Sequence, residues 1–248
     1  MVKYCPQCGY PNPDDASFCI KCGSPLFSQP NQPNSPPPPP ATQPLYSRML
    51  NVYFSNLWLI IIPIIELVVA LVFFAIDRAI MFYLFPTFGF YSFSVIIIVS
   101  IVIGLVESAI FSALIYALDL QANSLFLNNS RIEAGQAINV TFSRLSTILP
   151  IILLYIVINA LFSLVPFISF ILSGLLTLLL IHAYTMQLLG RGQGFDTFTV
   201  ALDNLGKAYN VDSTSTIVMV IVMIIPFVNW LLSPYVTLLS NALAAETR

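Results

Sequence analysis

The stretch TILPIILLYIVINALFSLVPFISFILSGLLTLLLIHAYTMQLL, residues 147–189, contains no Asp, Glu, Lys or Arg. A transmembrane helix needs about 20 mostly apolar residues. This stretch is too long for one span, and we expect it to divide at Val165-Pro166 into two. It therefore predicts a helical hairpin in the membrane near the centre of the chain.

Apolar stretches on both sides of this hairpin predict four more spans. The first runs from about Leu57 to Ile76 and the second from about Phe93 to Leu118. The last stretch, 213–245, divides at Ile225-Pro226, which gives six spans in all. Polar residues at its start leave a five-span alternative, with one crossing between 213 and 233 and the C-terminal tail on the far side.

The composition of the 248 residues agrees with a polytopic membrane protein. Hydrophobic residues make up 58% of the chain and charged residues 8%, whereas about 25% are charged in a typical soluble protein. The mean hydropathy is +0.88. So few charges cannot cover a water-facing surface, which excludes a soluble enzyme. Nine Lys and Arg residues also provide no basic surface for nucleic acid.

An internal repeat supports six spans arranged as three hairpins. NVYFSNL, beginning at Asn51, recurs as NVTFSRL from Asn139 and more faintly as TVALDNL from Thr199. Each unit is expected to be a short amphipathic lead-in followed by a hairpin. Two spans per unit preserve direction, so we predict an all-α bundle with pseudo-threefold symmetry. The three units are about 49–122, 131–190 and 191–248.

The lead-in segments 131–146 and 191–210 allow two interpretations. They either lie along the cytoplasmic lipid surface, as amphipathic helices do, or form ordinary helix starts and loops.

Lys and Arg residues predict the orientation, because they concentrate in cytoplasmic loops. With six spans and the N-terminus inside, eight of the nine cations are cytoplasmic, and only Arg78 lies outside. It belongs to a predicted external loop, 77–92, that is rich in Phe and Tyr. No secretory signal opens the chain, so both termini are expected in the cytoplasm.

All four cysteines lie in two half-sites, CPQCG from Cys5 to Gly9 and CIKCG from Cys19 to Gly23. Four thiolates in two C-x-x-C pairs are typical of tetrahedral zinc, with Cys5, Cys8, Cys19 and Cys22 as ligands. A disulfide framework does not fit a reducing cytosol, and a redox C-x-x-C lacks its βαβ context. Iron remains open. Because 27 residues bury little core, one structural metal ion is expected to stabilise this segment.

The segment YCPQCGYPNPDDASFCIKCGSPL resembles the short zinc-ribbon modules at the N-termini of many archaeal and bacterial proteins. The resemblance covers about residues 3–27 and implies a structural zinc and an interaction role. The whole layout is similar to uncharacterised archaeal membrane proteins that join a zinc ribbon to a multi-pass helical domain. We therefore divide the chain into a zinc ribbon (1–27), a linker (28–44) and a six-span membrane domain (45–248).

The linker SQPNQPNSPPPPPATQP contains eight prolines, five of them consecutive. Proline prevents helix and sheet, and 17 residues of polyproline II reach roughly 50 Å. We interpret the linker as a stiff spacer that holds the ribbon away from the bilayer. A docking site for a proline-binding domain is the alternative.

Three ionisable residues fall inside the predicted spans: Glu66, Glu107 and His182. Ionisable groups in a bilayer mark functional sites by default. Because the first two spans are antiparallel neighbours, both carboxylates can lie at similar depth and form a proton or cation site, which His182 can complete. The alternative is structural, with each group hydrogen-bonded to a neighbouring helix.

These features favour a non-enzymatic membrane scaffold or adaptor whose ribbon recruits a cytosolic or membrane protein partner. A small transporter or channel using Glu66 and Glu107 is the alternative, and an intramembrane lipid-modifying enzyme is a remote one. No catalytic motif is present in the sequence.

Overall fold

The computed structural model describes residues 2–5, 11–13, 19, 43–88, 90–165 and 168–247. This part of the chain is mostly helical. A two-stranded antiparallel sheet at the N-terminus pairs β1 (Val2–Tyr4) with β2 (Pro11–Pro13), with Lys3 opposite Asn12. The helices that follow are α1 (Leu45–Ser55), η1 (Leu57–Ile60), α2 (Ile61–Phe88), α3 (Phe90–Asn128), α4 (Ala134–Ser143), α5 (Leu145–Ser163), α6 (Ser169–Leu188), α7 (Asp196–Val211), α8 (Ser213–Ile224) and α9 (Val228–Glu246).

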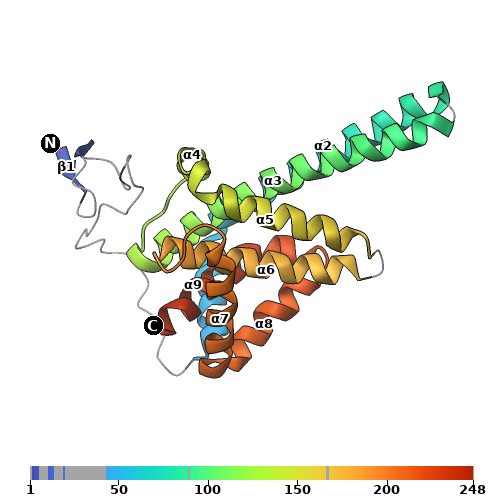
Figure 1. The fold of residues 1–248 in the computed structure, drawn as a ribbon. Helices are drawn as coiled ribbons and strands as arrows, with labels where there is room; N and C mark the ends of the chain where they lie inside the picture. Colours follow the sequence, from blue (N-terminus) through green and yellow to red (C-terminus); the bar gives the residue numbers. More distant parts are fainter. Residues whose placement is uncertain are drawn as a thin grey trace.

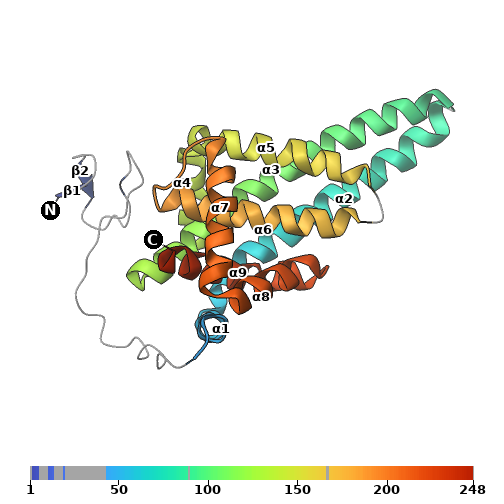
Figure 2. The ribbon, with the colours of Figure 1, turned by 60° about the horizontal axis from the view of Figure 1, so that its bottom comes forward.

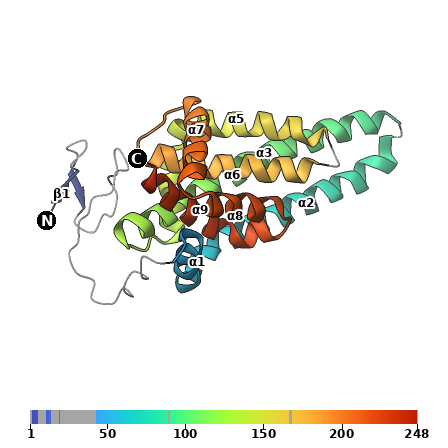
Figure 3. The ribbon, with the colours of Figure 1, turned by 90° about the horizontal axis from the view of Figure 1, so that it is seen from below.

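The helices form three hairpins, each preceded by a further helix. Helices α2 and α3, α5 and α6, and α8 and α9 are the three antiparallel pairs, and their tips lie at the same end of the molecule (Figures 1 and 3). Helices α1, α4 and α7 precede the pairs in chain order. Figure 2 shows the α2–α3 hairpin extending well beyond the tips of the other two. The open ends of the hairpins therefore lie at the opposite end of the bundle.

Four helical stretches are long and apolar enough to cross a membrane: Leu57–Tyr83, Ser94–Asn128, Leu145–Ser163 and Ser169–Leu188. They correspond to the first four predicted spans. Helix α8 is apolar but has only 12 residues, or about 18 Å of length, against a hydrocarbon core of about 30 Å. Helix α9 has 19 residues but carries several buried polar side chains, among them Ser233, Ser240 and Asn241.

The predicted external loop, 77–92, is helical instead. Helix α2 continues to Phe88 and α3 begins at Phe90. Inside this region Asp77 accepts hydrogen bonds from Ser100 Oγ on α3 (2.6 Å) and from Arg78 (2.8 Å). These bonds satisfy the carboxylate within the hairpin, so the charged pair does not interrupt the helix.

Large apolar side chains face outward along the long hairpin. Phe74, Phe82 and Tyr83 are 62%, 76% and 72% exposed. Exposed aromatic and aliphatic side chains on candidate spans are expected when the surrounding solvent is lipid. The described helical domain is therefore that of a membrane protein.

The core lies where the hairpins converge, around the C-terminal half of α3, α6 and α9. Tyr184 of α6 packs edge-to-face against Tyr116 of α3, with ring centroids 5.0 Å apart. The Tyr184 and Ser112 hydroxyl groups lie 2.7 Å apart. At the other end of α6, a Cβ added to Gly174 would overlap the backbone carbonyl of Met223 on α8. Glycine at this position permits the close approach of the two helices.

Helix α8 begins and ends at clear sequence signals. Asp212 accepts from the Ser215 backbone N–H (2.9 Å) and hydroxyl (2.6 Å), which is a side-chain N-cap. The helix ends before Pro226, because the residue preceding a proline is disfavoured in helical geometry. The turn is completed by Phe227 at φ 66°, so the predicted division at Ile225-Pro226 is where the hairpin reverses.

Helix α1 packs against the end of this third hairpin. The Tyr53 hydroxyl donates to the Leu231 carbonyl of α9 at 2.8 Å, and burial raises the pKa of Tyr53. The Tyr46 backbone N–H donates to Ser215 Oγ on α8 at 3.0 Å. These bonds join the start of the helical domain to its end.

Candidate functional site

The N-terminal sheet positions two of the four predicted zinc ligands. Cys5 directly follows β1, and the Cys5 and Cys19 side chains are each 2% exposed. Asn12 of β2 donates from Nδ2 to Cys19 Sγ at 3.6 Å. An N–H···S bond of this kind orients a thiolate without itself contacting the metal. The buried sulfurs and their amide donor therefore fit a metal-thiolate centre.

The other two predicted ligands, Cys8 and Cys22, lie outside the described residues. Among the residues that the structure does describe, no group of three or more His, Cys, Asp or Glu side chains could hold a metal ion. The four-cysteine site consequently stays a prediction from the two C-x-x-C pairs. Most of the proline-rich linker, up to residue 42, also lies outside the described part of the chain.

Glu66 and Glu107 line one cavity, as the antiparallel arrangement of the first two spans predicts. The cavity has a volume of about 350 Å³ and lies between α2, α3, α5 and α9. Its other polar or aromatic lining residues include Ser108, Phe111, Tyr155, Asn159 and Trp230. The structure therefore gathers four helices around the two carboxyl groups.

Glu66 occupies the more buried position of the pair. Glu66 is only 3% exposed. Its Oε1 atom has no hydrogen-bond partner among the described residues. Glu107 is partly buried. A buried carboxyl oxygen without a partner is costly, which sets Glu66 apart from a side chain that merely holds helices together.

His182 does not join the two carboxylates. Its Nδ1 lies 2.8 Å from Ser240 Oγ on α9, and its Nε2 lies 2.9 Å from Asn204 Oδ1 on α7. It is absent from the described residues that line the Glu66 cavity. The predicted three-residue site is thus corrected to a carboxylate pair and a separate histidine, because the side chain faces the α7–α9 side of α6.

Asp119 is a buried charged residue that sequence reasoning missed. It is 0% exposed and accepts hydrogen bonds at Oδ1 from Asn241 Nδ2 (2.7 Å) and Thr185 Oγ1 (3.2 Å). Its Oδ2 atom is buried without a partner among the described residues. The predicted second span ended one residue earlier, at Leu118, whereas α3 continues to Asn128. The available signal was the spacing of Ser112, Asp119 and Asn123, which places all three on one helix face.

These polar side chains form a continuous buried network. The Thr185 and Ser240 hydroxyl groups, 2.9 Å apart, connect Asp119 to His182. On the other side of Asp119, Asn123 donates to Asn241 Oδ1 at 2.7 Å. Beyond His182, Asn204 and Thr247 exchange hydrogen bonds of 2.9 and 3.1 Å. The network therefore joins α3, α6, α7 and α9 through side chains alone.

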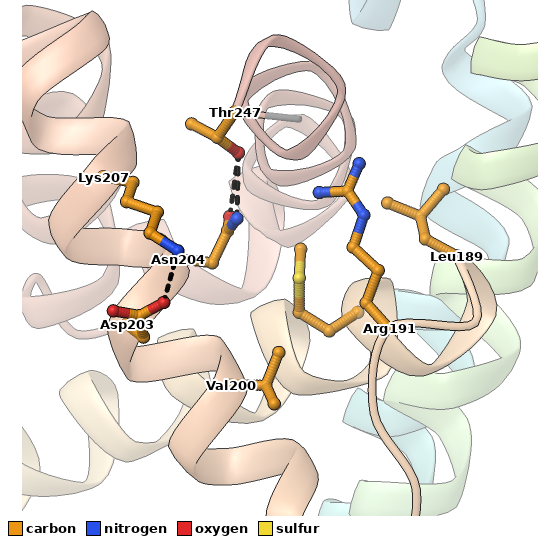
Figure 4. A pocket seen from close by; sticks show the side chains of 8 residues that line it. Leu189, Arg191, Val200, Asp203, Asn204, Lys207 and Thr247 are labelled. Carbon is orange, nitrogen blue, oxygen red and sulfur yellow. Dashed lines mark hydrogen bonds and ion pairs between the residues drawn. The ribbon is translucent and has the colours of Figure 1, made fainter.

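A second cavity, of about 530 Å³, opens at the Asn204 end of this network. Figure 4 shows its polar lining, with Lys207 paired to Asp203 at 2.6 Å and Asn204 directed at Thr247. Arg191 also lines it and donates from Nη1 to the Ala244 carbonyl at 2.8 Å. Each of the two cations already has one partner within the chain, Asp203 for Lys207 and the Ala244 carbonyl for Arg191.

The zinc-ribbon domain family matches residues 4–26. This range contains all four cysteines and both C-x-x-C-G half-sites. The match suggests zinc binding and agrees with the buried sulfurs of Cys5 and Cys19. No curated protein and no solved structure matches the chain.

Proposed function

We propose that the protein is an integral membrane scaffold or adaptor whose cytoplasmic zinc ribbon recruits a protein partner. The observation that carries this proposal is the zinc-ribbon match at residues 4–26 on the same chain as four candidate membrane spans. The proline-rich linker then sets the distance between the ribbon and the bilayer. The role is non-enzymatic, since no catalytic motif occurs in the sequence.

In this proposal the ribbon holds one structural zinc ion. Cys5, Cys8, Cys19 and Cys22 are the ligands, and the Asn12 side-chain amide donates to the Cys19 sulfur. Zinc ligated by four cysteines has no open position for substrate. It supplies folding free energy to a segment too short to bury its own core, and the folded surface is what a partner recognises.

Affinity purification from native membranes tests the adaptor function. The intact protein is compared with a variant lacking residues 1–44 and with a Cys5→Ser, Cys19→Ser variant that retains the linker. We expect partners that are captured by the intact chain and lost from both variants. Partners captured equally by all three proteins would contradict the proposal.

We also propose six spans in three related hairpins, with both termini cytoplasmic. The threefold succession of one helix and a helical hairpin supports this arrangement. The short helix α8 makes the third hairpin the decisive element. A cysteine introduced at Phe227, the 81% exposed tip, should react with an impermeant thiol reagent added from outside. Protection of that cysteine from both sides would instead give four spans and a half-inserted hairpin.

Transport is a second candidate function, and the shared cavity of Glu66 and Glu107 is the observation that favours it. Ionisable groups at membrane depth commonly mark ion or substrate pathways. Reconstituted protein should then show flux that is lost when both residues are changed to Gln, while removal of residues 1–44 leaves the flux intact.

A further inference from the structure

The cavity between α2, α3, α5 and α9 has the properties of a ligand site. Its volume of about 350 Å³ lies within the range of about 300–1,000 Å³ that small-molecule pockets occupy. Apolar residues such as Val69 and Leu114 form part of its wall, and a small number of polar groups converge on it. This combination is the usual chemistry of a small-molecule site.

The two carboxyl groups of the cavity favour a cation. Glu66 and Glu107 are both in its lining, and none of the described lining residues is Lys, Arg or His. Glu66 Oε1 is buried with no hydrogen-bond partner in the described part of the chain. A ligand that brings an N–H donor would satisfy this oxygen and neutralise the carboxylate at once.

The walls favour an organic cation over a metal ion. Phe111, Tyr155 and Trp230 line the same cavity, and aromatic side chains are common partners of organic ammonium groups. Among the described residues no cluster of three or more His, Cys, Asp or Glu suits a metal ion. The space is also far larger than a bare ion needs, whereas an apolar body attached to an ammonium group fills it.

We infer that this cavity binds a small protonated primary amine, with Glu66 as the hydrogen-bonding counter-ion and Glu107 as the second negative charge. Ser108 and Asn159 supply further polar groups at the same site. The inference goes beyond the adaptor function and does not depend on it. It also names a substrate class for the transport alternative, although binding requires no movement of the ligand across the membrane.

The chain offers a native reporter for this site. It has two tryptophans, Trp58 and Trp230, and only Trp230 is in the cavity lining. Trp58→Phe therefore leaves one fluorophore next to the proposed ligand. The full-length Trp58→Phe protein in lipid nanodiscs is titrated with n-hexylamine, and with 1-hexanol as the uncharged analogue that partitions into lipid.

We expect a saturable change of Trp230 fluorescence with hexylamine and none with hexanol. Glu66→Gln, which keeps the side-chain shape, should weaken binding at least tenfold, and Glu107→Gln about three- to tenfold. Glu133→Gln changes an exposed glutamate at the start of α4 and should leave the titration unchanged. Equilibrium dialysis of the same samples with radiolabelled hexylamine counts bound amine directly.

Three results would overturn the inference. These are equal titrations by hexylamine and hexanol, an unchanged affinity in Glu66→Gln, or no bound amine above the empty-nanodisc level in dialysis. Gel filtration and circular dichroism of each variant confirm that it is folded. If the Trp58→Phe protein binds no amine but still captures ribbon-dependent partners, this site is refuted and the adaptor function stands.

Discussion

Asn241 of α9 donates a 2.7 Å hydrogen bond from its side-chain amide to Asp119 of α3. Both residues are almost completely buried. The bond joins the last helix of the chain to the longest one and satisfies one oxygen of a carboxyl group that has no access to water. It is the central contact of the buried network that runs from Asn123 to Thr247.

Asn241→Ala should destabilise the helical domain by about 1–3 kcal/mol, because it leaves a buried acceptor with fewer partners. Asn229→Ala is the matched control on the same helix, since that amide makes only a long 3.4 Å bond to the Met223 carbonyl. Unfolding in mixed micelles measures both free energies. Equal stability of the two variants would show that the Asp119 contact contributes nothing.

His182→Leu should lower stability by about 1–2 kcal/mol, because it removes both ring-nitrogen bonds, to Ser240 and to Asn204. The same variant should bind hexylamine as the parent protein does, since His182 is not in the lining of the Glu66 cavity. A loss of amine affinity as large as that of Glu66→Gln would place His182 in one site with the carboxylates.

Removal of the metal should unfold the ribbon and leave the helices intact. The hydrophobic core formed by the described residues begins at Leu45, so the helical domain does not rely on the N-terminal cysteines for its burial. Elemental analysis should give one zinc per chain, and Cys19→Ser should abolish it. Asn12→Ala should weaken zinc affinity about 10–100-fold, as loss of a hydrogen-bond partner of a metal ligand does. Undiminished zinc content in Cys19→Ser would exclude the four-cysteine site.

Gly174→Ala should destabilise the protein by about 1–3 kcal/mol, because the new methyl group overlaps the Met223 carbonyl and forces α6 from α8. Gly206→Ala, in the interior of α7 with open space around it, should instead be neutral or stabilising by up to about 1 kcal/mol. Thermal unfolding of the two variants in detergent gives the comparison. An unchanged melting temperature for Gly174→Ala would contradict this prediction, because it would mean that α6 and α8 can move apart without a loss of stability.

The helices were largely predictable from the sequence because long apolar stretches have one viable conformation in lipid. The division near Val165-Pro166 and the turn at Ile225-Pro226 were visible as proline positions. The extent of the two helices toward the tip of the first hairpin was not predictable from the sequence. The bonds from Ser100 and Arg78 to Asp77 keep a charged pair inside a continuous helix.

The candidate site was predictable in part. Opposed helices brought Glu66 and Glu107 to one cavity, as their depth suggested. The direction in which His182 faces depends on how α6 packs against α7 and α9, which no local pattern specifies. Asp119 was missed because its apolar stretch appeared to end at Leu118, while tertiary hydrogen bonds to Asn241 and Thr185 keep it inside the bundle.

Helix α3 has 39 residues and contains no proline, so it forms a rod of about 58 Å, nearly twice the thickness of the hydrocarbon core. Glu107 and Asp119 are both carried on this rod. A bilayer that thickens or thins changes the tilt of a long helix. A straight helix carries that tilt along its whole length. The cavity of Glu66 and Glu107 and the buried network around Asp119 are thus built on one continuous helix, which extends well past the hydrocarbon core.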